Sequence, residues 1–212
     1  MKMFLFAATA TALCASGASA HTYFVENYAP AGYKQDMAMR VPHGCKSSPV
    51  KEVHVKIPEN VMGVTVAYNR DWKIETKMRK LDKPVPGEGG VMISETVDEI
   101  IWKDPQSPLP AMGYFDTFQF RVSLPKEEGA VVWFKSYNVC VEGDDKYVEV
   151  PKETLNAKMP DFAKKIATFM RSVPGPAPYV VLTKPTHAQY PWETLEPAKA
   201  EMAAPTKAAA AK

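Results

Sequence analysis

Apolar and polar side chains alternate along much of this chain, and this period-two pattern predicts short β-strands. The clearest predicted strand ends before Pro58 and has on one face Val53, Val55 and Ile57. Another, over residues 115–124, begins with Asp116 in line with a buried face of Phe118, Phe120, Val122 and Leu124. Further strands are expected over residues 37–41, 61–68, 72–76, 91–102 and 178–182. Strands this short and numerous are typical of an all-β fold, an antiparallel β-sandwich.

Three stretches depart from simple alternation. Residues 130–137 are apolar at both even and odd positions, as expected of a central strand covered on both faces. Residues 83–90 are so rich in Pro and Gly that we expect no regular structure there. After residue 161, apolar side chains recur at helical spacing and predict one short amphipathic helix, which ends at residues 173–176 and seats its stripe on the sandwich: Phe162, Ile166, Phe169 and Met170.

The two ends of the chain differ from its middle. Residues 1–20 combine Lys2, an apolar run over residues 3–13 and the small residues Ala18 and Ala20, which is the layout of a secretory signal peptide. We expect a β-sandwich domain over residues 21–184 and a low-complexity, disordered tail over residues 185–212. No other apolar run approaches the roughly 20 residues of a membrane span, so a periplasmic or secreted location is expected.

Charge and motifs exclude several classes of function. The 26 basic and 24 acidic residues give a net charge of +2 and form no basic stripe, so neither nucleic acid nor an anionic membrane is an expected partner. The sequence contains no GxSxG, no HExxH and no Cys-His nucleophile pattern. We therefore expect a protein that is not an enzyme.

Cysteine and histidine carry the candidate chemistry. Cys14 leaves with the signal peptide, so the mature chain keeps Cys45 and Cys140. In an oxidising compartment these two are expected to form a disulfide worth roughly 4 kcal/mol, although a thiolate copper ligand is the alternative. Cleavage after Ala20 would make His21 the first residue, with an α-amine and an imidazole that can chelate a metal such as Cu(II).

The other three histidines are weaker candidates. His43 lies in a corner before the first mature cysteine, where a structural hydrogen bond is the default and a ligand role the alternative. His54 alternates with apolar neighbours and is expected on the polar surface. His187 lies in a predicted linker and suggests no chemistry.

Several stretches keep a characteristic order along the chain: His21 after the leader, Trp72, and residues 40–45, 55–61, 80–84, 97–102, 115–120, 138–143 and 176–178. As an ordered set they resemble the YcnI-like copper-binding domain of exported bacterial proteins. The resemblance implies an immunoglobulin-like or cupredoxin-like sandwich that binds Cu(II) through the amine and Nδ1 of His21. It also implies an acidic ligand from a neighbouring strand and a nearby tryptophan.

This chain departs from that pattern at two places. Similar sequences tend to carry Asp-Glu or Gln-Glu where Asp116 and Thr117 stand. Asp116 is therefore the expected acid here, because Thr117 cannot act as an anionic donor if the second residue of the pair is the ligand. The tryptophan expected after the second cysteine is missing, and Tyr147 is the nearest aromatic residue there. The predicted metal site is therefore His21 and Asp116, with Tyr147, His43 and Thr117 as neighbours or additional ligands.

Three classes of function follow. The first is a periplasmic Cu(II)-binding protein for copper trafficking or homeostasis, which passes its ion to another periplasmic copper chaperone or a membrane copper transporter. The second is a copper-dependent polysaccharide oxidase, which would need a second histidine, His43 or His54, beside His21. The third is a metal-free structural or interaction domain.

Overall fold

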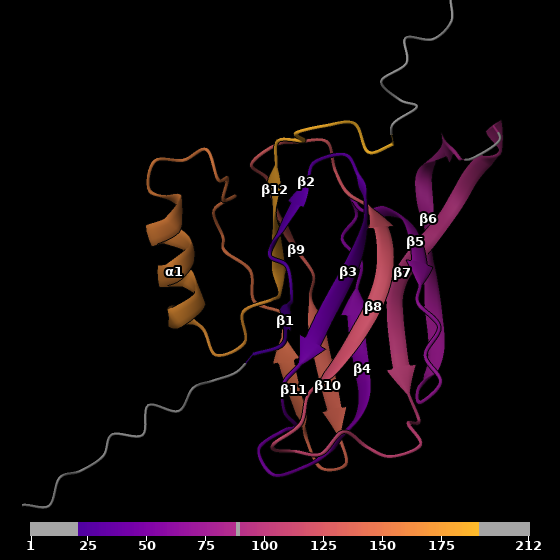
Figure 1. Ribbon diagram of the computed structural model, residues 1–212, viewed down its shortest axis with the longest axis vertical. Helices are drawn as coiled ribbons and strands as arrows, with labels where there is room; N and C mark the ends of the chain where they lie inside the picture. The colour runs from indigo at the N-terminus through magenta and orange to yellow at the C-terminus, as the bar shows by residue number, and fades with distance from the viewer. Residues whose placement is uncertain (1–20, 88–89, 191–212) are drawn as a thin grey trace, which may run out of the picture.

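The computed structural model describes residues 21–87 and 90–190, so the predicted signal peptide and most of the predicted tail lie outside the described residues. Within them the chain forms mainly strands (Figure 1). The strands are β1 Tyr23–Phe24, β2 Tyr28–Pro30, β3 Lys34–Val41, β4 Val50–Lys56, β5 Met62–Val66, β6 Lys73–Pro86, β7 Met92–Lys103, β8 Asp116–Ser123, β9 Val131–Trp133, β10 Ser136–Cys140, β11 Asp144–Tyr147 and β12 Tyr179–Thr183. The helix α1 spans Phe162–Ser172, as its apolar periodicity predicts.

The strands form three sheets. A four-stranded sheet has the order β1-β3-β8-β5, and a five-stranded sheet has the order β11-β10-β4-β7-β6. A smaller sheet, β2-β12-β9, contains a parallel pair, β12 with β2. Every other strand pair is antiparallel. The arrangement is an all-β sandwich, as the alternation predicts.

Aromatic side chains join the two larger sheets. Trp102 of β7 is fully buried, and its ring centroid lies 5.2 Å from that of Phe118 and 6.2 Å from that of Phe120 on β8. Both phenylalanines occupy inward positions of the predicted alternating strand. This contact across the core holds the sheets face to face.

Residues 130–137 form two strands in different sheets, so the prediction of one central strand was wrong. β9 belongs to the three-stranded sheet and β10 to the five-stranded sheet, and Phe134, fully buried, lies between them. Both parities of β9 are covered because Val132 faces the core while Trp133 meets Phe169 of α1 at 5.5 Å between ring centroids. Residues 130–137 are therefore apolar at both even and odd positions because both faces are covered, although they do not form one long central strand.

The Pro-rich stretch from residue 83 also departs from expectation, because β6 continues to Pro86. Val85 pairs with Ile93 and Pro86 with Met92. β6 is the edge strand of its sheet, so the missing N–H of proline costs no ladder hydrogen bond on the outer side. An irregular register between Lys80 and Val85 accommodates the change in backbone.

Helix α1 lies beside the smaller sheet, at the side of the sandwich (Figure 1). Its one buried residue is Ile166. The backbone after the helix returns along β11 before entering β12. In the described part of the chain, no helix has the length and apolar character to cross a membrane.

Candidate metal site

Five segments of the chain surround a surface cavity of about 510 Å³. They are the segment before β1, the corner after β3, the connection between β7 and β8, strand β11 and the segment after α1. The lining residues are His21, Pro42, His43, Lys46, Ala111, Met112, Gly113, Asp145, Lys146, Tyr147 and Pro174. Three of the residues singled out from the sequence thus share one cavity: His21, His43 and Tyr147.

His21 is held at the cavity by a backbone carbonyl. Its Nε2 lies 3.1 Å from the carbonyl oxygen of Pro174. A carbonyl oxygen only accepts hydrogen bonds, so Nε2 carries the proton and Nδ1 carries the lone pair. Nδ1 is the nitrogen that can share a metal ion with the α-amine of the same residue.

A close backbone contact between Gly175 and β11 fixes the position of Pro174. A Cβ added to Gly175 would lie 2.0 Å from the carbonyl oxygen of Lys146, so only glycine lets this segment approach β11 so closely. The amide of Glu149 donates to the Gly175 carbonyl at 3.0 Å, and the amide of Ala177 donates to the Glu149 carbonyl at 2.8 Å. The chain leaving the helix is thereby fixed against β11.

The ring of Tyr147 packs beside His21 and borders the cavity. The two rings meet edge to face with centroids 5.7 Å apart, and Tyr147 is buried. Burial raises the pKa of Tyr147 to about 12, with Asp145 adding to the rise and a hydrogen bond with Thr22 opposing it. The phenol is therefore protonated at neutral pH, which favours packing over ligation as a phenolate.

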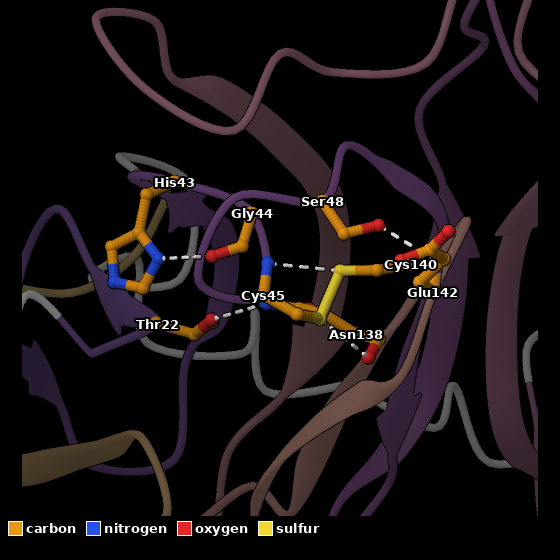
Figure 2. Close-up of a disulfide and its surroundings, with 8 residues drawn as sticks. All are labelled: Thr22, His43, Gly44, Cys45, Ser48, Asn138, Cys140 and Glu142. Carbon is orange, nitrogen blue, oxygen red and sulfur yellow. Dashed lines mark hydrogen bonds between the residues drawn. A yellow bond between two sulfur atoms is a disulfide. The ribbon is translucent and has the colours of Figure 1, made fainter.

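The disulfide between Cys45 and Cys140 fixes the corner that carries His43 (Figure 2). This bond confirms the expected pairing, and the Cys45 amide also donates to the Cys140 sulfur at 3.0 Å. His43 Nδ1 lies 2.6 Å from the Gly44 carbonyl oxygen, the structural hydrogen bond expected of it. By the same reasoning as for His21, Nδ1 of His43 carries the proton and Nε2 the lone pair.

Asp116 and Thr117 are not among the residues that line this cavity. Both carboxylate oxygens of Asp116 accept hydrogen bonds, one from the indole of Trp72 at 2.8 Å and one from the Thr117 amide at 2.7 Å. Strand β3 lies between β1 and β8, so these residues are two strands away from the chain that follows His21. Asp116 as a metal ligand stays a prediction.

Asp145 is the carboxylate in the cavity, and reasoning from the sequence missed it. Asp145 and Tyr147 alternate on β11, so both face the same side. The spacing of two residues from Tyr147, which was already a candidate, is the sequence signal that could have identified Asp145. Among the residues described, no three His, Cys, Asp or Glu side chains gather in a way that could hold a metal ion. A metal at this cavity would thus depend on the α-amine as well.

His54 is buried, so the prediction of a surface histidine was wrong. Its Nδ1 lies 2.9 Å from Glu99 Oε1 and its Nε2 lies 3.0 Å from Glu52 Oε2. Its ring stacks on Tyr137 with centroids 4.0 Å apart. Glu99 comes from β7 and Tyr137 from β10, the two neighbours of β4, while Glu52 belongs to β4 itself. Together these side chains cover the outward face of β4.

Comparisons with known proteins agree with the fold. Among curated proteins, none matches the chain significantly. The structure resembles the crystal structure of an uncharacterized protein from Nocardia farcinica with an immunoglobulin-like fold, at a TM-score of 0.53 and 22% sequence identity. The match covers 77% of this chain and 99% of the other. The model of one family, described as "Domain of unknown function (DUF1775)", matches residues 21–166, and the chain belongs to that family.

Proposed function

We propose that this protein binds Cu(II) outside the cytoplasm through the α-amine and Nδ1 of His21, after cleavage behind Ala20. The observation that carries the proposal is the hydrogen bond from His21 Nε2 to the Pro174 carbonyl. This bond sets the tautomer and restrains the imidazole before a metal arrives. Metal-binding histidines are commonly oriented in this way by a carbonyl or carboxylate behind the ring.

Cu(II) fits the donors better than other divalent first-row ions. An amine and an imidazole nitrogen close a chelate ring, and Cu(II) stands highest among these ions in affinity for nitrogen donors. The amine has an ordinary pKa near 8, so the metal must displace a proton at neutral pH. Asp145 offers an oxygen donor in the same cavity, and Tyr147 limits access from one side.

The proposed role is copper trafficking or homeostasis. A site with few protein ligands at an open surface can release its ion to a partner, such as another periplasmic copper chaperone or a membrane copper transporter. The resemblance to YcnI-like copper-binding domains supports this role. Copper is cargo in this proposal, so no catalytic step is assigned to the protein.

One observation favours a polysaccharide oxidase as the second candidate, because His43 lines the same cavity as His21. Such an enzyme would use both histidines on one copper ion. Incubation of the copper-loaded protein with cellulose or chitin and a reductant separates the two candidates. Oxidised oligosaccharides support the oxidase, whereas their absence at full copper loading supports trafficking.

The decisive test compares the processed protein, beginning at His21, with a variant that carries one additional glycine before His21. Cu(II) is titrated into each, and electron paramagnetic resonance spectra and competition affinities are recorded. The extension moves the amine away from the imidazole, so the spectrum is expected to change and the affinity to fall. Identical spectra and affinities would overturn the proposal.

Thermal unfolding separates copper binding from a metal-free role. A ligand that binds only the native state raises the midpoint of unfolding. Cu(II) is therefore expected to raise the midpoint of the processed protein, and Zn(II) to raise it less. An unchanged midpoint with saturating Cu(II) would favour the metal-free structural domain.

A further inference from the structure

We infer that His43 Nε2 and the Met112 thioether form a second copper position, selective for Cu(I), in the cavity that also holds His21. The inference rests on the proposed function for its choice of copper. It goes beyond that function by assigning the reduced ion to different donors. No redox step is involved, because the ion is supplied already reduced.

A backbone contact brings the segments that carry the two donors together. The amide of Gly44 donates to the Ala111 carbonyl at 3.1 Å, which joins the corner before Cys45 to the connection between β7 and β8. A Cβ on Gly44 would lie 3.0 Å from the Ala111 Cα, so these backbones touch. His43 and Met112 each lie one residue from this contact, and both line the cavity.

His43 presents the correct nitrogen. Its Nδ1 donates to the Gly44 carbonyl at 2.6 Å, which leaves Nε2 to bind a metal. In Figure 2, Nε2 lies on the side of the ring that points away from Gly44. The disulfide behind Cys45 holds this corner to β10, so the imidazole is oriented by a rigid frame.

Met112 supplies a soft donor with no packing role in the core. Its side chain is 77% exposed, while most large apolar side chains of the described chain are buried or partly buried. A thioether is a poor ligand for Cu(II) and a good one for Cu(I), and it does not compete with protons. Imidazole and thioether are both neutral, which suits a monovalent cation.

The test uses the processed protein with its methionine methyl groups labelled with ¹³C, and Ag(I) as a monovalent ion that cannot be oxidised by air. Nuclear magnetic resonance is expected to show one methyl signal shifted on Ag(I) addition. Replacing Met112 by leucine should remove that signal. A shifted signal that survives Met112→Leu would overturn the assignment.

Anaerobic competition against a chromogenic Cu(I) chelator measures the affinity. Met112→Leu and His43→Ala are each expected to weaken Cu(I) binding about tenfold or more, because loss of an outer partner of a ligand alone typically costs about 10–100-fold and a direct ligand contributes at least as much. Met78→Leu is the matched control, because Met78 is 53% exposed on β6 and does not line this cavity. Equal Cu(I) affinity of Met112→Leu and Met78→Leu would contradict the inference.

The two copper proposals can fail separately. The variant with glycine before His21 should show a changed Cu(II) spectrum and weaker Cu(II) binding, yet keep the Ag(I) shift at Met112. Loss of that shift in the extended variant would overturn the assignment to His43 and Met112. Met112→Leu should keep the Cu(II) spectrum of the processed protein, and a changed spectrum would show that the thioether belongs to the Cu(II) site instead.

Discussion

His21 and Pro174 are 153 residues apart in sequence, and their side chain and carbonyl meet at 3.1 Å. The contact exists because the segment after helix α1 returns along β11 rather than passing directly to β12. The segment that follows the helix thus places a hydrogen-bond acceptor beside His21. The acceptor fixes which nitrogen of His21 can bind a metal.

Gly175→Ala should disturb this contact. The new methyl group would lie 2.0 Å from the Lys146 carbonyl, so the segment must shift and carry Pro174 away from His21. Overpacking of this kind typically costs about 1–3 kcal/mol in the free energy of unfolding. Urea denaturation should show that loss, and the Cu(II) affinity of the processed protein should fall.

Gly90→Ala provides the control for this prediction. Gly90 has a φ of 78°, and a Cβ there would meet no atom within 4 Å. Its substitution strains the backbone by about 1–2 kcal/mol but leaves the cavity unchanged. If both variants kept normal Cu(II) affinity, the Pro174 carbonyl would have no role in metal binding.

Asp145→Asn and Asp116→Asn distinguish the two candidate carboxylates. Asp145 lines the cavity with His21, so its loss should weaken Cu(II) binding on the order of tenfold. Asp116 accepts a hydrogen bond from Trp72, so Asp116→Asn should mainly lower stability. Competition titration and thermal unfolding measure the two effects. The opposite pattern would restore Asp116 as the acidic ligand.

Local patterns predicted much of the fold. Phe118 and Phe120 lie on the inward face because strand alternation needs no long-range information. The pairing of Cys45 with Cys140 was predicted from the expected export and from the two cysteines that remain outside the predicted signal peptide. The end of α1 at residue 172 followed from the Pro and Gly residues that come next.

Contacts between distant segments could not be predicted in the same way. Pro174 reaches His21 only through the return of the chain along β11, which no local pattern encodes. His54 alternates correctly, yet partners on β7 and β10 bury its polar face. Alternation tells which side of a strand a residue faces, and only the tertiary structure tells what covers that side.

Tyr147→Phe should leave Cu(II) binding almost unchanged. Burial, the largest cause, raises the pKa of the phenol to about 12, so at neutral pH the hydroxyl is protonated and the ring serves as a wall. Phenylalanine keeps the edge contact with His21, whereas Tyr147→Ala removes it. Electron paramagnetic resonance should give matching Cu(II) spectra for the unsubstituted protein and Tyr147→Phe, with Tyr147→Ala as the comparison. A changed spectrum in Tyr147→Phe would indicate ligation by the phenol oxygen.

Glu99 should make the stability of the sandwich sensitive to acid. Burial raises the pKa of Glu99, but hydrogen bonds from Lys77, His54 and Tyr137 outweigh burial and hold the pKa at about 2, below its ordinary 4.5. Because the folded pKa is lowered, this stabilisation is present above about pH 4.5 and is lost as the pH falls toward 2. Glu99→Gln should therefore be less stable at pH 7 and show a flatter decline in acid.

Urea denaturation at pH 7, 5, 4 and 3 measures this effect for the unsubstituted protein and for Glu99→Gln. Asp36→Asn is the matched control, because hydrogen bonds donated by Arg121 also lower the Asp36 pKa but the pair lies exposed in solvent. An exposed ion pair contributes about 0–1 kcal/mol, so Asp36→Asn should follow the unsubstituted protein closely. The two variants behaving alike would mean that the buried cluster around His54 does not control acid stability. A smaller stability difference between Glu99→Gln and the unsubstituted protein at pH 3 than at pH 7 is the expected result. At pH 3 Glu99 is largely protonated in the unfolded chain, where its pKa is the ordinary 4.5, so folding must release that proton and part of the stabilisation is lost.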